Sequence, residues 1–127
     1  MKLTVYNRNF IPDVSFPTED GTTEKNRDLP LEKQVSCEVD LCTIGERETY
    51  LSNNDIEGCV IHKCKKIKGL EAFGITDGKT LVDGVNTGYI DLIPVVNSIY
   101  MKTCGMHDSD RDPKMRTLSD GEFSPKE

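Results

Sequence analysis

The sequence predicts an α+β domain in which a small antiparallel sheet is packed by two to three helices. Between residues 35 and 41, apolar residues alternate with polar ones, which is the period of a half-buried strand. In the segments 53–68 and 91–104, apolar residues recur three and four positions apart, which is typical of amphipathic helices. A chain of 127 residues accommodates one such domain without a second independent core.

The composition of the chain argues against several kinds of partner and cellular location. The 22 acidic residues outnumber the 16 basic ones and give a net charge of −6, which argues against nucleic acid as a partner. The mean hydropathy is −0.50. Because no apolar run approaches the roughly 18 residues that a bilayer requires, no membrane partner is expected. Residues 1–6 have no long apolar stretch behind them, so we expect no secretory signal. The odd number of cysteines, five, favours a reducing cytoplasm over a disulfide framework.

Residues 1–33 are interpreted as an N-terminal strand followed by an extended arm or loop. Leu3 and Val5 alternate with polar residues, so a strand is predicted over residues 2–10, and a proline follows it closely. Residues 13–33 contain two more prolines, a glycine and many charges, without any apolar period. Such a segment buries too little apolar surface to offset its ordering entropy, so we expect a long loop or a flexible arm.

The compact core is predicted at residues 34–105, and it begins with a strand over residues 35–44. Residues 48–51 fit either a second strand or a helical turn. Ser52 and the carboxylate three residues later have the spacing of a capping box, which predicts the start of the helix 53–68. Acidic residues in its first turn and lysines near its end suit the helix dipole.

Two further helices are predicted in the second half of the core. A short helix lies between Thr80 and Gly88, where the glycine ends it. The terminal helix spans residues 91–104, and Pro94 is tolerated because it falls in the first turn. The remaining residues, 106–127, are polar and are expected to form a flexible tail.

The cysteines suggest a four-cysteine metal site at first sight. Cys37 and Cys42 are five residues apart, as are Cys59 and Cys64, and Cys104 forms a third group with the nearby His107. Residues five apart face opposite sides of a strand and are rotated by about 140° on a helix. Neither pair is therefore expected to converge on one ion, and buried free thiols are favoured over a metal or cofactor. A small zinc-binding module remains a third alternative.

No enzyme constellation emerges from the remaining motifs, so a non-enzymatic protein is predicted. The segment Gly74–Thr80 nearly matches a phosphate-binding loop, but three residues separate its glycines where four are needed. His62 has no carboxylate at helical spacing, and His107 at a helix end is explained by the helix dipole. The lysines between residues 63 and 68 are interpreted as a solvated helix face.

The order of several segments resembles small tail assembly chaperones of bacteriophages and prophages. That family often shows a Lys-Lys-Ile-x-x-Leu helix end, a turn with a glycine, and a final helix before a polar tail. The resemblance covers residues 35–104. The segments that carry it are the strand 35–44 running into Ile44–Leu51, then Cys59–Leu70, Thr76–Asp83 and the terminal apolar helix.

The resemblance implies a protein partner in the host cytoplasm, namely the long helical tape-measure protein or another phage structural protein. It carries over no catalytic residue, because such proteins act by binding. The predicted contact surface is the apolar stripe of the terminal helix, which consists of Tyr89, Leu92, Val96, Ile99 and Tyr100. The alternative is a virion subunit of the capsid, neck or tail, whose arm and tail contact neighbouring copies as a homo-oligomer.

Overall fold

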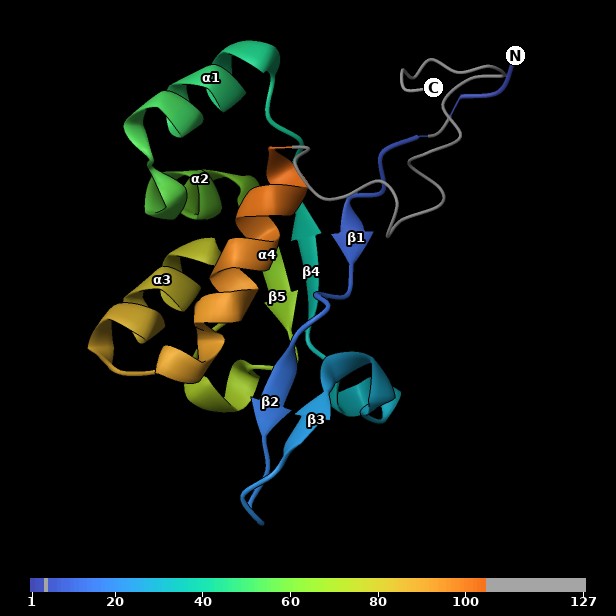
Figure 1. Cartoon of the computed structure of the whole chain (residues 1–127), viewed down its shortest axis with the longest axis vertical. Helices are drawn as coiled ribbons and strands as arrows, with labels where there is room; N and C mark the ends of the chain where they lie inside the picture. Colours follow the sequence, from blue (N-terminus) through green and yellow to red (C-terminus); the bar gives the residue numbers. More distant parts are fainter. Residues whose placement is uncertain (4, 105–127) are drawn as a thin grey trace.

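The computed structural model describes residues 1–3 and 5–104, and its mixed helix and strand content confirms the predicted α+β class. Helices α2, α3 and α4 gather to one side of a three-stranded antiparallel sheet with the order β1-β4-β5, and a two-stranded hairpin projects beyond one end of it (Figure 1). The strands are β1 (Asn9–Phe10), β2 (Ser15–Pro17), β3 (Thr23–Lys25), β4 (Ser36–Val39) and β5 (Cys64–Lys68).

The helical layer is built around α2, which packs against both α3 and α4. The helices are α1 (Ile44–Asn53), α2 (Ile56–Lys63), α3 (Gly78–Thr87) and α4 (Ile93–Thr103). The side chains that are excluded from solvent in the core include Val39, Val60, Ile67, Ile75, Leu81, Val95 and Ile99. Full burial of each stabilises the fold by about 1.5–3 kcal/mol relative to exposure. Among the described residues, no helix is long and apolar enough to cross a membrane.

The two helices predicted for the second half of the core are confirmed. Helix α3 begins after Asp77, whose side chain accepts a hydrogen bond from the Thr80 amide at 2.9 Å, and ends before Gly88. Helix α4 is preceded by a 3₁₀ turn at Ile90–Leu92 and has its proline in the first turn, as expected. The predicted polar tail, 106–127, lies outside the described residues.

The helix predicted over residues 53–68 is wrong in its second half. Its N-cap is Asp55, whose side chain accepts from the Gly58 amide at 2.9 Å, and not Ser52. The helix ends at Lys63, and the chain continues directly as strand β5. The lysines that follow therefore belong to a strand, where the sequence analysis had expected a solvated helix face.

A β-bulge explains why strand β5 resembles a helix in the sequence. Glu38 pairs with Lys66 while its neighbour Val39 pairs with Cys64, so Lys65 is an extra residue on β5. The bulge brings Cys64 and Ile67, three positions apart, to the same buried face. In a regular strand, residues three apart would face opposite sides, and their spacing was therefore read as helical.

The strand predicted over residues 35–44 is shorter in the structure and ends at Val39. Thr43 begins α1 with a capping box, in which its side chain accepts from the Glu46 amide and the Glu46 side chain accepts from the Thr43 amide. Residues 48–51, for which a strand or a helical turn was left open, therefore lie within a helix.

The N-terminal third contains more regular structure than its composition predicts. The strand predicted over residues 2–10 is limited to β1, and Leu3 and Val5 are 68% and 85% exposed. Where a loop or flexible arm was expected, β2 and β3 form an antiparallel hairpin. Its turn is held by Asp20, and hydrogen bonds from Thr18 and Thr22 lower the pKa of that carboxyl to about 2.

Candidate functional site

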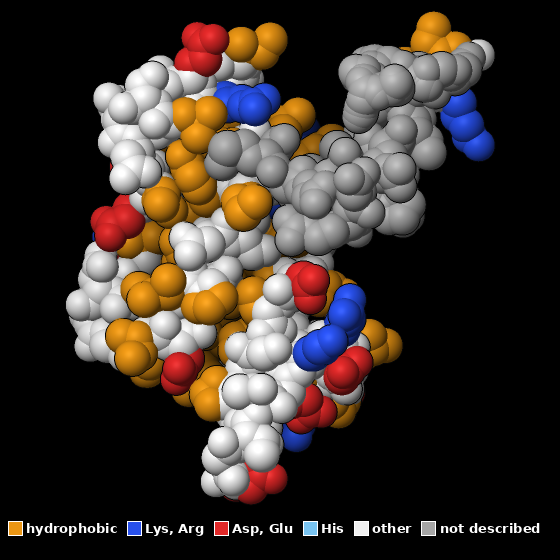
Figure 2. Space-filling view, in the orientation of Figure 1, with side chains coloured by type: hydrophobic (Ala, Val, Ile, Leu, Met, Phe, Trp, Pro, Cys, Tyr) orange, Lys and Arg blue, Asp and Glu red, His pale blue; other side chains and the backbone are white. Residues whose placement is uncertain are grey.

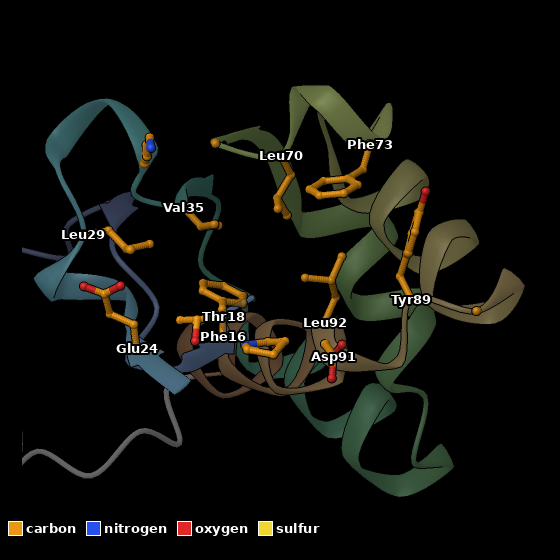
Figure 3. Close-up of a pocket in the computed structure, with 14 residues that line it drawn as sticks. Phe16, Thr18, Glu24, Leu29, Val35, Leu70, Phe73, Tyr89, Asp91 and Leu92 are labelled. Atoms are coloured by element: carbon orange, nitrogen blue, oxygen red, sulfur yellow. The ribbon is translucent and has the colours of Figure 1, made fainter. Parts of the chain in front are cut away.

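An apolar groove of about 380 Å³ opens between the β2–β3 hairpin and the helical layer. In Figure 3, Leu70 and Leu92 point toward each other across its middle, with Phe73 and Tyr89 to one side and Leu29 to the other. This volume lies within the roughly 300–1,000 Å³ of typical ligand pockets. The apolar side chains of its lining are Phe16, Pro17, Leu29, Val35, Leu70, Phe73, Tyr89 and Leu92.

Two groove residues, Leu70 and Tyr89, are positioned by short turns that follow a strand and a helix. Gly69 ends β5 with a φ of +98°, and a Cβ atom there would lie 2.5 Å from the carbonyl oxygen of Gln34. Only glycine permits this close approach, after which Leu70 turns into the groove. Tyr89 follows the C-cap of α3, where Gly88 has a φ of +137°.

Two aromatic side chains stand at the mouth of the groove. The rings of Phe73 and Tyr89 meet edge to face, with centroids 5.5 Å apart and planes at 67°. They are 54% and 44% exposed, although Leu70 and Leu92 beneath them are buried. The exposed side chains of Ile90 and Ile93 stand beside Tyr89 and Leu92 in the sequence. We call Phe73 and Tyr89 the groove rim.

The groove also has a polar lining. It comprises Thr18, Glu24, Lys33 and Asp91, and the described lining contains neither a histidine nor a cysteine. Figure 2 shows apolar side chains gathered over the helical part of the molecule, with acidic and basic side chains beside the hairpin. An apolar wall with a partly charged border is suited to binding an apolar segment.

The structure separates the five residues of the predicted contact surface. Tyr89 is on the groove rim and Leu92 forms part of the floor. Val96, Ile99 and Tyr100 are instead buried in the domain core, because α4 packs against α2, α3 and β4. Most of the stripe therefore faces its own domain, and only its first two members reach the candidate site.

Several groove residues were missed by the sequence analysis. Phe16 and Leu29 lie in the segment that was interpreted as an arm, and Leu70 and Phe73 lie in a glycine-punctuated connection. Phe16, Leu29 and Phe73 are isolated apolar residues without a periodic neighbour, so no pattern in the sequence marks them, whereas Leu70 is the leucine of the Lys-Lys-Ile-x-x-Leu segment. Their proximity arises only because the hairpin folds back beside β5 and the turn at Ile90–Leu92.

The five cysteines form a second feature, and all are buried free thiols, as predicted. Cys37 and Cys42, which are five residues apart, lie in different groups of cysteines, and so do Cys59 and Cys64. The Cys37 thiol interacts with that of Cys64, and this contact and burial raise its pKa. The sulfurs of Cys42, Cys59 and Cys104 all lie within 4.8 Å of one another. We call these three residues the thiol cluster.

The remaining sequence motifs have structural explanations. In the glycine-rich segment, Asp77 and Thr80 form the capping box of α3, and hydrogen bonds from Thr80 lower the pKa of Asp77. His62 Nδ1 lies 3.2 Å from the Tyr50 hydroxyl. His107 lies outside the described residues.

The lysine at the end of α2 is paired within the domain. Lys63 Nζ lies 2.6 Å from Glu46 Oε1, which lowers the pKa of Glu46 and raises that of Lys63. Lys65 on β5 lies 3.9 Å from Asp40, which also pairs with Arg8 at 3.1 Å. Part of the basic cluster therefore contacts acidic residues of its own domain.

Comparison of the chain with protein-family models, with curated proteins and with solved structures gave no match. The groove and the thiol cluster are therefore the two features from which a function is inferred.

Proposed function

We propose that this chain is a non-enzymatic protein that acts through protein–protein contacts, with the groove receiving an apolar segment of its partner. The observation that carries the proposal is the pair Phe73 and Tyr89, which stands half-exposed above a buried floor of leucines. Exposed aromatic side chains beside an apolar pocket are typical anchors of protein interfaces. Burying them in a partner would remove further apolar surface from water.

More specifically, we propose that the chain is a tail assembly chaperone whose client is a phage tape-measure protein. One segment that carries the resemblance departs from the family's pattern, since Lys65, Lys66 and Ile67 lie in strand β5 and not at a helix end. The order of the other segments over residues 35–104 supports this form. A helical client would present apolar residues along one face, and such a face fits a hydrophobic groove. Glu24 and Asp91 border the groove with one lysine, Lys33, so basic residues beside the client's apolar face would be favoured.

The test is co-expression with the tape-measure protein encoded by the same phage genome. We expect the wild-type chain to keep this client in the soluble fraction. The double variant Phe73→Glu/Tyr89→Glu should lose this effect, because two carboxylates would be desolvated by the client's apolar face. The matched control is Ile44→Glu, since Ile44 is 80% exposed at the start of α1 and does not line the groove.

Circular dichroism of each purified variant shows whether its fold is retained. A client that stays insoluble with the wild-type chain, or two variants that behave alike, would contradict the proposal. Presence of the chain in purified particles at fixed stoichiometry would instead favour the virion subunit.

A further inference from the structure

Three separate elements bring the thiol cluster together. Cys42 lies in the connection between β4 and α1, where its amide donates to the Thr103 carbonyl at 2.9 Å. Cys59 lies on α2, and Cys104 directly follows α4. The Cys59 sulfur is 3.9 Å from the Cys42 sulfur and 3.9 Å from the Cys104 sulfur. All three side chains are buried, so the surrounding packing restricts the positions of the sulfurs.

These distances match the spacing of sulfur ligands around one ion. Three sulfurs that each lie about 2.3 Å from a shared ion are separated from one another by roughly 3.8 to 4.0 Å. The separations of the Cys59 sulfur from those of Cys42 and Cys104, both 3.9 Å, already have this value, and the third separation is no longer than 4.8 Å. A shift of the Cys42 or Cys104 side chain by less than 1 Å would complete the triangle.

We propose that Cys42, Cys59 and Cys104 bind one monovalent copper ion as three thiolates. Thiolate is a soft ligand that selects copper(I) and zinc over harder ions. Structural zinc sites almost always have four protein ligands. The three sulfurs that converge here supply three soft ligands, which matches an ion that accepts three. This set differs from the four cysteines considered from sequence spacing.

Protons leave the cluster when the ion binds. Burial is the main cause that raises the thiol pKa values of Cys42 and Cys59. One copper(I) ion replaces three protons, and the complex carries a net charge of −2. The positive charge of Lys63 favours the Cys42 thiolate. Because protons compete with the ion, affinity falls as the pH is lowered.

Thr103 is placed to support the bound form. Its hydroxyl donates to the Tyr100 carbonyl at 3.1 Å and also lies 3.1 Å from the Cys59 sulfur. When Cys59 loses its proton, rotation of the hydroxyl lets Thr103 donate to the thiolate instead. Thr103 is thus a positioning residue, and outer partners of this kind typically change metal affinity by about 10- to 100-fold.

A hollow of about 540 Å³ lies beside the two residues that precede Cys42. It is lined by Tyr6, Leu41 and Lys63, among others. Leu41 directly precedes Cys42, and the Tyr6 hydroxyl donates to the Lys102 carbonyl at 3.1 Å.

The test is an anaerobic copper(I) titration of the reduced, untagged full-length chain against bathocuproine disulfonate as a competing chelator. The wild-type chain should retain one copper(I) per chain, and more tightly as the pH rises. Cys59→Ser should weaken binding at least tenfold, and Thr103→Val by about tenfold. The matched control Cys37→Ser should bind like the wild type, because Cys37 interacts with Cys64 outside the cluster.

X-ray absorption at the copper edge of the loaded wild-type chain tests the ligands without any variant. Three sulfur neighbours would support the proposal. A shell containing nitrogen or oxygen, or equal affinities for the wild type and Cys59→Ser, would overturn it. Stoichiometric zinc binding without competitive copper(I) binding would also overturn it.

Discussion

At the residue scale, Asn26 ties the N-terminal third of the chain to the sheet. Its side chain is fully buried, although it lies in a segment rich in charges. The amide nitrogen donates to the carbonyls of Pro12 at 3.1 Å and Val35 at 2.9 Å, and its oxygen accepts from the Val35 amide at 2.9 Å. These hydrogen bonds satisfy buried backbone groups of Pro12 and Val35, which lie outside the paired strands. Asn26 therefore stabilises the strand-to-hairpin arrangement that forms one wall of the groove.

Asn26→Ala should lower the free energy of unfolding by roughly 2–4 kcal/mol, because buried backbone groups of Pro12 and Val35 lose their partners. Urea denaturation measures this change. The control is Gln34→Ala, since the Gln34 amide also donates to two carbonyls, those of Arg27 and Leu29, but lies nearer the surface. Its loss should amount to about 1 kcal/mol or less. Equal losses for the two variants would contradict the role assigned to Asn26.

At the scale of elements, the contact between α2 and α3 depends on a glycine. A Cβ atom on Gly78 would lie 2.1 Å from the Val60 carbonyl oxygen and 3.0 Å from Cβ of Cys64. The first turn of α3 therefore passes directly against the end of α2. This close approach explains the second glycine of the segment that nearly matches a phosphate-binding loop.

Gly78→Ala should destabilise the domain by about 1–3 kcal/mol, because α3 must move away from the backbone of α2. Thermal and urea unfolding of the purified variant measure the effect. Gly45→Ala serves as the control: Gly45 lies in α1 with open space around it, and alanine there should stabilise by roughly 0.5–1 kcal/mol. A Gly78 variant as stable as the wild type would refute the assigned packing.

At the scale of the whole molecule, both edges of the three-stranded sheet are protected against pairing with another sheet. Edge strand β1 has only two residues. Edge strand β5 presents exposed Lys65, Lys66 and Lys68, and its Ile67 amide already donates to the Thr76 carbonyl at 2.8 Å. Short edges and lysines on edge strands are common defences against such pairing. The groove is therefore a better contact surface than either sheet edge.

Light scattering of the reduced chain should give a mass near 14.2 kDa at several concentrations, because the sheet edges do not favour self-association. Phe73→Glu should have the same mass, since the groove is proposed to receive a different protein. A discrete oligomer or ring would support the virion subunit and count against the chaperone. Repeating the measurement without reductant tests whether the cysteines link copies.

Periodic segments were predictable from the sequence by itself. The strand at β4 and the helices α3 and α4 follow from alternating or helical apolar patterns, together with the glycine and proline that bound them. The α+β class and the buried state of the cysteines followed from the same patterns. These apolar patterns are local signals, because a helix or strand needs one apolar face to be buried whichever neighbouring element packs against that face.

Only the tertiary structure decided which residues meet. The bulge at Lys65 is a matter of strand pairing, so a local pattern could not distinguish β5 from a helix. The groove joins residues from the hairpin, the end of β5 and the start of α4, and the thiol cluster joins three elements. Periodicity shows that a side chain is buried, but its neighbours depend on long-range packing. For this reason most of the predicted contact stripe became core, whereas isolated residues such as Phe16 and Phe73 formed the candidate site.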